Sequence, residues 1–204
     1  MATPPLETQL RSPLRSWPQD VLRIGFGFIW LIDAMLKWLP GFRSTYVTAV
    51  TGVAHGQPGW LKWWFDFWVK LQHPRPTIFA YLVAVVETLV AVAIIIGVAR
   101  KVTYLASALY GLGLWAVAEG FGGPYAKGST DIGAGIMYSV VSVGLLTLCY
   151  YAGVSRHSVD FYLEKRISWW WRIAEVRGAD AQVLGHSVDS ASFRLDPQLS
   201  DLSS

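Results

Sequence analysis

The chain has very few of the residues that disulfide and cofactor chemistry requires. Its 204 residues include one cysteine, Cys149, so no disulfide, Cys-x-x-Cys pair or thiolate metal site can form within one chain. Cys149 lies in an apolar run and is expected to be a small buried hydrophobe. None of the 4 histidines lies in a predicted membrane span, so bis-histidine haem ligation is not expected. The chain also lacks a phosphate-loop motif and a nucleophile elbow.

Charge is scarce as well, and apolar and aromatic residues are abundant. Only 15% of the residues are charged, whereas 53% are hydrophobic, and there are 11 tryptophans and 9 tyrosines. This composition is too apolar for an ordinary soluble domain, and Trp and Tyr are typical of membrane interfaces. The formal net charge of +3 is small and does not indicate nucleic-acid binding.

Four stretches contain the roughly 20 apolar residues that a transmembrane helix needs. They are 20–39, 77–98, 102–119 and 131–152. These stretches predict an all-α fold, an integral membrane four-helix bundle. We do not expect the first to be a cleaved signal peptide, because it contains Asp33 and Lys37 and no Ala-x-Ala-type site follows it.

The distribution of basic residues predicts the orientation of the bundle. Eleven of the 17 lysines and arginines lie on the side that holds both termini, and six lie on the other side. By the positive-inside rule, both termini are cytoplasmic. The outer loop 40–76 and the Gly-rich loop 120–130 then lie outside, and residues 1–19 form a cytoplasmic N-terminal tail.

One outer segment, 59–71, is expected to be an interfacial helix. Lys62, Asp66 and Lys70 recur every four residues and form one narrow polar stripe, while aromatic residues cover most of the remaining surface. A helix of this kind lies in the outer headgroup layer or caps the bundle.

A second amphipathic segment, 158–175, lies within the predicted cytoplasmic region 153–177. Asp160, Glu164 and Arg172 share one face, and apolar residues occupy the other. We expect this helix to lie on the inner leaflet, whose anionic lipids attract basic residues. Residues 178–204 are rich in Ser and Asp and are expected to form a disordered tail.

Five charged residues in or beside the apolar runs fall on the same half of the bundle, the outer one. They are Asp33, Lys37, Glu87, Glu119 and Asp131. Because a charge near the bilayer centre costs about 3 to over 10 kcal/mol, such residues usually face protein or water. They therefore predict an outward-facing polar pocket. The inner half has no comparable charge if Arg23 snorkels to the cytoplasmic surface, which argues against a transport path through the monomer.

Each of these residues has a structural interpretation as well as a functional one. Asp33 and Lys37 are four residues apart, so they either form an internal salt bridge or leave Lys37 to bind an anionic or carbonyl group in the pocket. Glu87 lies in the middle of its span and must be protonated or paired, for instance with Lys37. It either joins helices or acts in the pocket.

Glu119 ends the third span, where the helix macrodipole disfavours an anion. We expect Lys37, Arg43, Lys127 or a bound cation to compensate it. Asp131 is expected to lie in the favourable first turn of the fourth helix, after a capping Ser129 or Thr130.

No metal site is expected. His55 and His73 lie in the outer loop, 18 residues apart. They could ligate a metal together with Glu119 or Asp131, but solvated loop histidines are the favoured interpretation.

Several short motifs follow one another along the chain in a characteristic order. They are Arg23-Ile-Gly25 followed by Lys37, then Glu87 followed by Gly97-Val-Ala-Arg100, then Gly153-Val-Ser-Arg-His-Ser-Val-Asp160. Together they resemble the DoxX family of membrane proteins over residues 20–160. The long first outer loop and the segment around Glu119 and Asp131 resemble the DoxD-like branch, which includes the membrane subunit of thiosulfate:quinone oxidoreductase. The resemblance implies a multi-pass bacterial inner-membrane protein linked to redox chemistry through quinone or a partner oxidoreductase.

The first functional hypothesis is a membrane redox component. A quinone headgroup would enter the outer half of the bundle near four aromatic residues: Trp30, Trp38, Tyr110 and Trp115. Lys37 would donate a hydrogen bond to a carbonyl, and Glu87 or Glu119 would exchange protons. The electrons would come from a soluble substrate or an extracytoplasmic redox protein. If the chain is an enzyme, it is a quinone-linked oxidoreductase or a subunit of one.

The alternative is a non-enzymatic membrane anchor or assembly subunit for an extracytoplasmic partner. The aromatic helix 59–71 would be its docking surface, and the acidic residues would hold the bundle together. Binding of a cation or small molecule at the acidic pocket is the least favoured hypothesis.

Overall fold

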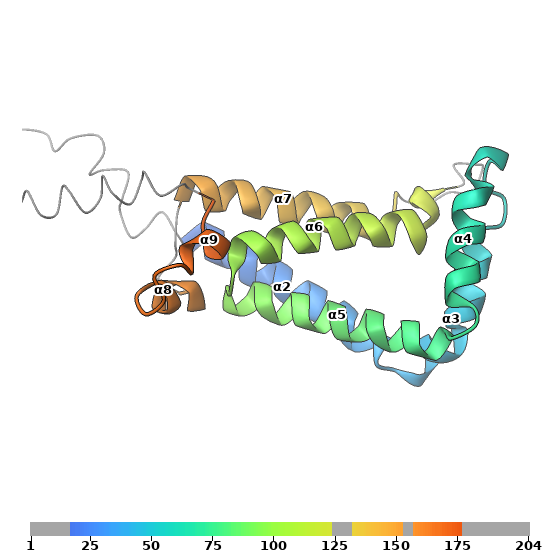
Figure 1. The fold of residues 1–204 in the computed structure, drawn as a ribbon, viewed down its shortest axis with the longest axis horizontal. Helices are drawn as coiled ribbons and strands as arrows, with labels where there is room; N and C mark the ends of the chain where they lie inside the picture. Colours follow the sequence, from blue (N-terminus) through green and yellow to red (C-terminus); the bar gives the residue numbers. More distant parts are fainter. Residues whose placement is uncertain (1–16, 124–131, 153–156, 177–204) are drawn as a thin grey trace, which may run out of the picture.

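The computed structural model describes residues 17–123, 132–152 and 157–176 (Figure 1). All regular secondary structure in these residues is helical, so the prediction of an all-α fold is confirmed. The four long helices are α2 (Trp17–Lys37), α5 (Pro76–Ile96), α6 (Arg100–Val117) and α7 (Ala134–Ala152). They lie over the four predicted apolar stretches, and their ends differ from the predicted ones by no more than three residues.

The long helices run along the long axis of the molecule as two antiparallel pairs, α2 with α5 and α6 with α7 (Figure 1). Two helices, α3 (Pro40–Val53) and α4 (Lys62–Gln72), lie across one end of these pairs. The short helices α8 (Val159–Glu164) and α9 (Trp171–Ala174) lie at the other end. We call these the α3–α4 end and the α8–α9 end.

One helix in the described part of the chain, α5, is long and apolar enough to cross a membrane. In α7 the apolar segment Ala134–Tyr150 is shorter. Length and composition alone therefore give limited evidence for a membrane protein.

Small residues let α6 and α7 approach each other closely. A Cβ atom at Gly111 would lie 2.8 Å from the carbonyl oxygen of Gly135, and one at Gly135 would lie 2.6 Å from that of Gly111. The hydroxyl of Ser139 donates to the Ala108 carbonyl at 2.9 Å, so hydrogen bonding accompanies the close packing. Interfaces of this kind are typical of helices that pack in lipid, where small residues and hydroxyls join neighbouring helices.

Gly111→Ala should therefore destabilise the protein, because the added methyl group meets the backbone of α7. Overpacking typically costs about 1–3 kcal/mol. Gly113→Ala is the matched control: it lies on the same helix with nothing within 4 Å of the added Cβ. It should be neutral or stabilising by up to about 1 kcal/mol, from helix propensity. Unfolding free energies measured in mixed micelles compare the two, and equal values would contradict the close packing.

The outer loop 40–76 contains more helix than the sequence predicted. The α3 helix was not expected, although Pro40 stands at its start, a position that suits proline because its missing N–H is not needed there. The helix predicted over 59–71 is present as the short 3-10 helix η2 (Gly59–Leu61) followed by α4, and its position at a membrane interface stays a prediction.

The single amphipathic helix predicted over 158–175 is wrong. The segment forms α8 and α9 with a turn between them, and Asp160 is fully buried instead of solvated. Its carboxylate accepts hydrogen bonds from the backbone N–H groups of Ala99 and Arg100 at 2.6 and 2.9 Å. It also accepts one from the Trp170 indole at 2.8 Å. Asp160 is buried because its carboxylate caps the start of α6, where the first N–H groups have no partner within the helix.

Glu164, predicted on the same solvated face, is half-buried. Burial is the main reason why the pKa of Glu164 is raised to about 7, and repulsion from the neighbouring Glu175 carboxylate adds to it.

Arg23 does not snorkel, and this prediction is also wrong. Its side chain is 1% exposed, and it donates to the carbonyl of Ile94 at 2.8 Å and to that of His157 at 3.1 Å. It thereby satisfies backbone groups at the end of α5, which have no partner within the helix. With Asp20 at 3.5 Å from Arg23, and with the buried Arg100–Asp160 pair, the α8–α9 end does contain charges. The expectation that the inner half of the bundle has no charge comparable to the outer cluster is therefore wrong.

Some predictions fall outside the described residues. They concern most of the N-terminal tail 1–19, the tail 178–204, most of the Gly-rich loop, Lys127 and Asp131.

Candidate functional site

Glu87 is the most deeply buried carboxylate among the predicted site residues. It lies in the middle of α5, where its side chain is 0% exposed among apolar neighbours. Its Oε1 accepts a long hydrogen bond from the Tyr110 hydroxyl of α6 at 3.4 Å. Its Oε2 lies 3.8 Å from the Nζ of Lys37 at the end of α2. Side chains from two other helices thus meet the carboxylate.

Lys37 lies between two carboxylates. Its ammonium group donates to Asp33 Oδ1 at 2.9 Å, closer than its 3.8 Å distance to Glu87. The side chains of Lys37 and Asp33 are 21% and 31% exposed, so this pair connects the buried Glu87 to the surface. If all three groups are ionised they sum to one negative charge, and a proton or a bound donor is needed to balance it.

An aromatic cluster lies between the two helix pairs. The fully buried Trp30 of α2 stacks on Tyr110 with ring centroids 6.5 Å apart, and its ring lies 4.8 Å from that of Tyr138 on α7. Phe26 packs edge-on against both Trp30 and Tyr138. The sequence analysis did not single out Tyr138, although it is an aromatic residue in a run of small and aliphatic ones.

Two polar atoms of this region have no hydrogen-bond partner among the described residues. They are the indole nitrogen of Trp30, a donor, and Oε2 of Glu87, an acceptor whose nearest cation is the more distant Lys37. Buried polar atoms are nearly always paired, so these two atoms retain hydrogen-bonding capacity that a water molecule or a ligand can use. A donor and an acceptor beside aromatic rings suit a planar molecule with oxygen atoms at its edge.

Glu119 does not belong to this group. In the described part of the chain it forms no ion pair with Lys37 or Arg43, and Lys127, another predicted partner, lies outside the described residues. Both of its carboxylate oxygens lie 3.0 Å from the backbone N–H of Gly135, in the first turn of α7. The positive end of the α7 macrodipole therefore balances the charge that the end of α6 disfavours. Arg43, one of the predicted partners, instead donates to the Trp38 carbonyl at 2.8 Å.

The two remaining predicted aromatic residues also have structural contacts. The Trp115 indole donates to the Ile132 carbonyl at 2.8 Å and so joins the end of α6 to the start of α7. The Trp38 indole donates to the Thr88 hydroxyl at 3.0 Å. Thr88 is the next residue after Glu87 in the sequence. Of the predicted site residues, Lys37, Glu87 and Tyr110 thus lie together, Trp38 lies at their edge, and Trp115 and Glu119 lie elsewhere.

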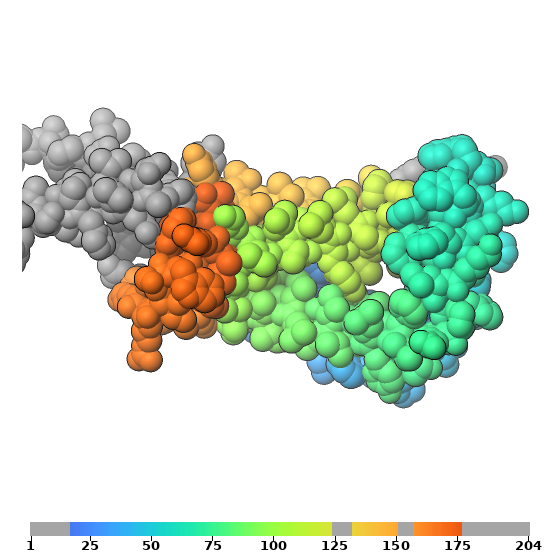
Figure 2. Space-filling view, viewed as in Figure 1, coloured from blue at the N-terminus to red at the C-terminus, as the bar shows by residue number. Residues whose placement is uncertain are grey.

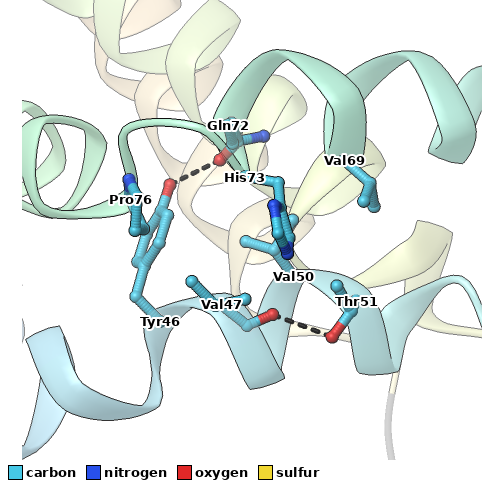
Figure 3. Close-up of a pocket in the computed structure, with 8 residues that line it drawn as sticks. All are labelled: Tyr46, Val47, Val50, Thr51, Val69, Gln72, His73 and Pro76. Atoms are coloured by element: carbon cyan, nitrogen blue, oxygen red, sulfur yellow. Dashed lines mark hydrogen bonds between the residues drawn. The ribbon is translucent and has the colours of Figure 1, made fainter.

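A small cavity lies between α3, α4 and the start of α5 (Figure 3). Its volume is about 10 Å³, and it is lined by eight residues: Tyr46, Val47, Val50, Thr51, Val69, Gln72, His73 and Pro76. Burial raises the pKa of Tyr46, whose hydroxyl donates to Gln72 Oε1. Ligand sites usually enclose about 300–1,000 Å³, so this cavity is a packing gap.

Within the described residues, no cluster of three or more His, Cys, Asp or Glu side chains could hold a metal ion. The two loop histidines considered above are both exposed. Comparison of the chain with protein-family models, curated proteins and solved structures gives no match.

The role of Glu119 as a helix cap can be tested by substitution. Glu119→Ala removes both acceptors and should cost about 0.5–2 kcal/mol of stability, as the loss of a cap does. Glu119→Gln keeps one acceptor and should lose less, about 0.3–1 kcal/mol from the charge at the helix end. Unfolding in mixed micelles measures both. Wild-type stability of Glu119→Ala would show that the contact with Gly135 does not stabilise the fold.

Proposed function

We propose that this chain is a DoxX-type bacterial inner-membrane protein that spans the bilayer with α2, α5, α6 and α7 and acts as a quinone-linked redox component. The observation that carries the proposal is Glu87, a fully buried carboxylate that only side chains contact: Lys37 from α2 and Tyr110 from α6. The DoxX resemblance of residues 20–160 supports the same conclusion.

The surface of the long helices supports the membrane part of the proposal. Large apolar side chains are exposed on all four, among them Ile32 (65%), Leu89 (64%), Leu109 (61%) and Val140 (59%). Exposed apolar surface distributed in this way is unfavourable in water and favourable in hydrocarbon. Charged residues on α2 and at the start of α6, together with the shorter apolar segment of α7, explain why hydropathy alone selects α5.

Exposed tryptophans and tyrosines are concentrated at the two ends of the molecule. Trp38, Trp60, Trp63 and Tyr81 are exposed at the α3–α4 end, and Trp17, Tyr150, Tyr162 and Trp169 at the α8–α9 end. Two aromatic belts of this kind mark the two membrane interfaces. The excess of lysine and arginine makes the α8–α9 end cytoplasmic and the α3–α4 end extracytoplasmic.

The space-filling view supports access from the lipid. Figure 2 shows a hollow where the outer parts of α5 and α6 separate beside α4. A ligand dissolved in the bilayer would approach the partly exposed Lys37 and Asp33 from this end of the long helices.

The residues present fit a quinone headgroup. The unpaired Trp30 indole offers a donor, Lys37 offers a second, and the rings of Tyr110 and Tyr138 flank Trp30. When bound, a quinone accepts two electrons and two protons to become a quinol. The electrons would come from a soluble donor or an extracytoplasmic redox protein.

Four residues of the proposed site then have defined roles. Lys37 donates a hydrogen bond to the bound carbonyl, and Glu87 holds and releases a proton at its carboxyl group. Tyr110 orients the carboxyl through its hydroxyl. Asp33, partly exposed and hydrogen-bonded to Lys37, connects the buried site to water on the outer side.

Quinone binding can be measured by quenching of tryptophan fluorescence by a short-chain ubiquinone in lipid nanodiscs. Lys37→Met should weaken binding at least about tenfold, because a hydrogen bond from a charged donor contributes about 1.5–3 kcal/mol. Trp30→Phe should reduce the amplitude of quenching. Lys70→Met, which alters an exposed lysine of α4, and Trp115→Phe are matched controls that should behave like wild type. Equal affinity of Lys37→Met and Lys70→Met would overturn the proposed site.

A substitution of Glu87 separates the redox hypothesis from the anchor hypothesis. Glu87→Gln should still fold and bind quinone, but it should lose quinone reduction by thiosulfate or another soluble donor. If Glu87 only holds the bundle together, Glu87→Gln will lower stability and leave any partner-dependent activity per folded molecule unchanged.

A further inference from the structure

The α4 helix has three different faces. The surroundings of two of them, protein and water, follow from the structure. One face packs on the bundle: Phe65 is 2% exposed, and the Trp64 indole donates to the Ala116 carbonyl of α6 at 3.0 Å. A second face carries Lys62, Asp66 and Lys70 at four-residue spacing, with both lysines exposed, as suits contact with water.

The third face is apolar and exposed. It consists of Trp60, Trp63, Phe67 and Leu71, which are 73%, 68%, 54% and 45% exposed. These residues follow a spacing of three to four and so form one continuous stripe beside the lysine face. Four large apolar side chains exposed side by side need a cover, because leaving them in water is unfavourable.

The position of α4 indicates what covers this stripe. In Figure 1, α4 lies across the end of the long helices. Exposed Trp38 and Tyr81 stand at the same end, where α2 stops and α5 begins. A helix that crosses the ends of membrane-spanning helices lies parallel to the membrane plane, at the depth of the headgroups.

We propose that the Trp60–Trp63–Phe67–Leu71 face of α4 is inserted at the headgroup boundary of the outer leaflet, with Lys62 and Lys70 at lipid phosphates. The three faces then meet protein, lipid and water in turn. This inference rests on the proposed membrane span, but it does not depend on quinone binding. It assigns the stripe to lipid instead of to a protein partner.

Charge complementarity supports a lipid surface as the occupant. Lys62 and Lys70 flank the stripe, and exposed His73 and Arg75 follow at the end of α4. Asp66, half-exposed, is the only acidic residue of the helix. Basic residues beside an aromatic stripe are the usual pattern of helices that lie on phospholipid.

Site-directed spin labelling can test this inference directly, because the chain has one cysteine. In a Cys149→Ala background, a nitroxide label is attached at Phe67→Cys on the apolar face or at Lys70→Cys on the polar face. The full chain is reconstituted in phosphatidylethanolamine–phosphatidylglycerol vesicles without any partner protein. Collisions with lipid-soluble oxygen and with a water-soluble nickel complex are then measured. A label at Leu89→Cys on the exposed face of α5 reports on the span itself.

We expect the label at 67 to collide mainly with oxygen, the label at 70 mainly with nickel, and the label at 89 with oxygen alone. Equal nickel accessibility at 67 and 70 would overturn the lipid assignment, since the apolar face would then point into water and await a protein. Nickel accessibility at 89 would overturn the membrane span and the α4 inference together. Loss of quinone binding with an unchanged label pattern would overturn the redox function alone.

Discussion

A carboxylate in the middle of an apolar helix needs partners that lipid cannot supply, and Glu87 finds them on two other helices. Lys37 approaches it from the end of α2, and Tyr110 reaches it from α6. The aromatic contacts of Trp30 with Tyr110 and Tyr138 join α2 to α6 and α7 beside it. The two helix pairs therefore meet at a polar centre, and the one lysine serves two carboxylates. That imbalance is the reason why we propose proton exchange at this centre.

Three other charged residues of the described chain are satisfied differently. Arg23 binds the carbonyls at the end of α5, Asp160 binds the N–H groups at the start of α6, and Glu119 binds an N–H group at the start of α7. Each completes the backbone hydrogen bonding of a helix end, where the helix leaves groups without partners. Glu87 is different because it lies far from any helix end and contacts side chains only. This difference in partners separates the residues that hold the fold from the residue at the candidate site.

Much of the helical layout could be predicted from the sequence, because apolar runs and their proline and glycine boundaries are local signals. The proximity of Lys37 and Glu87 was also predictable, since a charge in mid-span requires a partner of opposite sign. The assignments of Asp160 and Glu119 were not predictable. Their partners are backbone groups 60 and 16 residues away, which helical periodicity does not reveal. Trp115 was predicted to lie in the pocket because it is aromatic, but its indole N–H donates to the Ile132 carbonyl.

Infrared difference spectroscopy would test the central claim, that Glu87 exchanges a proton with a bound quinone, most directly. The reconstituted protein with short-chain ubiquinone is compared before and after reduction of the quinone. The proposal predicts a change in a carboxyl C=O band that is absent from Glu87→Gln and kept in Glu119→Gln. A difference spectrum of Glu87→Gln identical to that of the unsubstituted protein would contradict it.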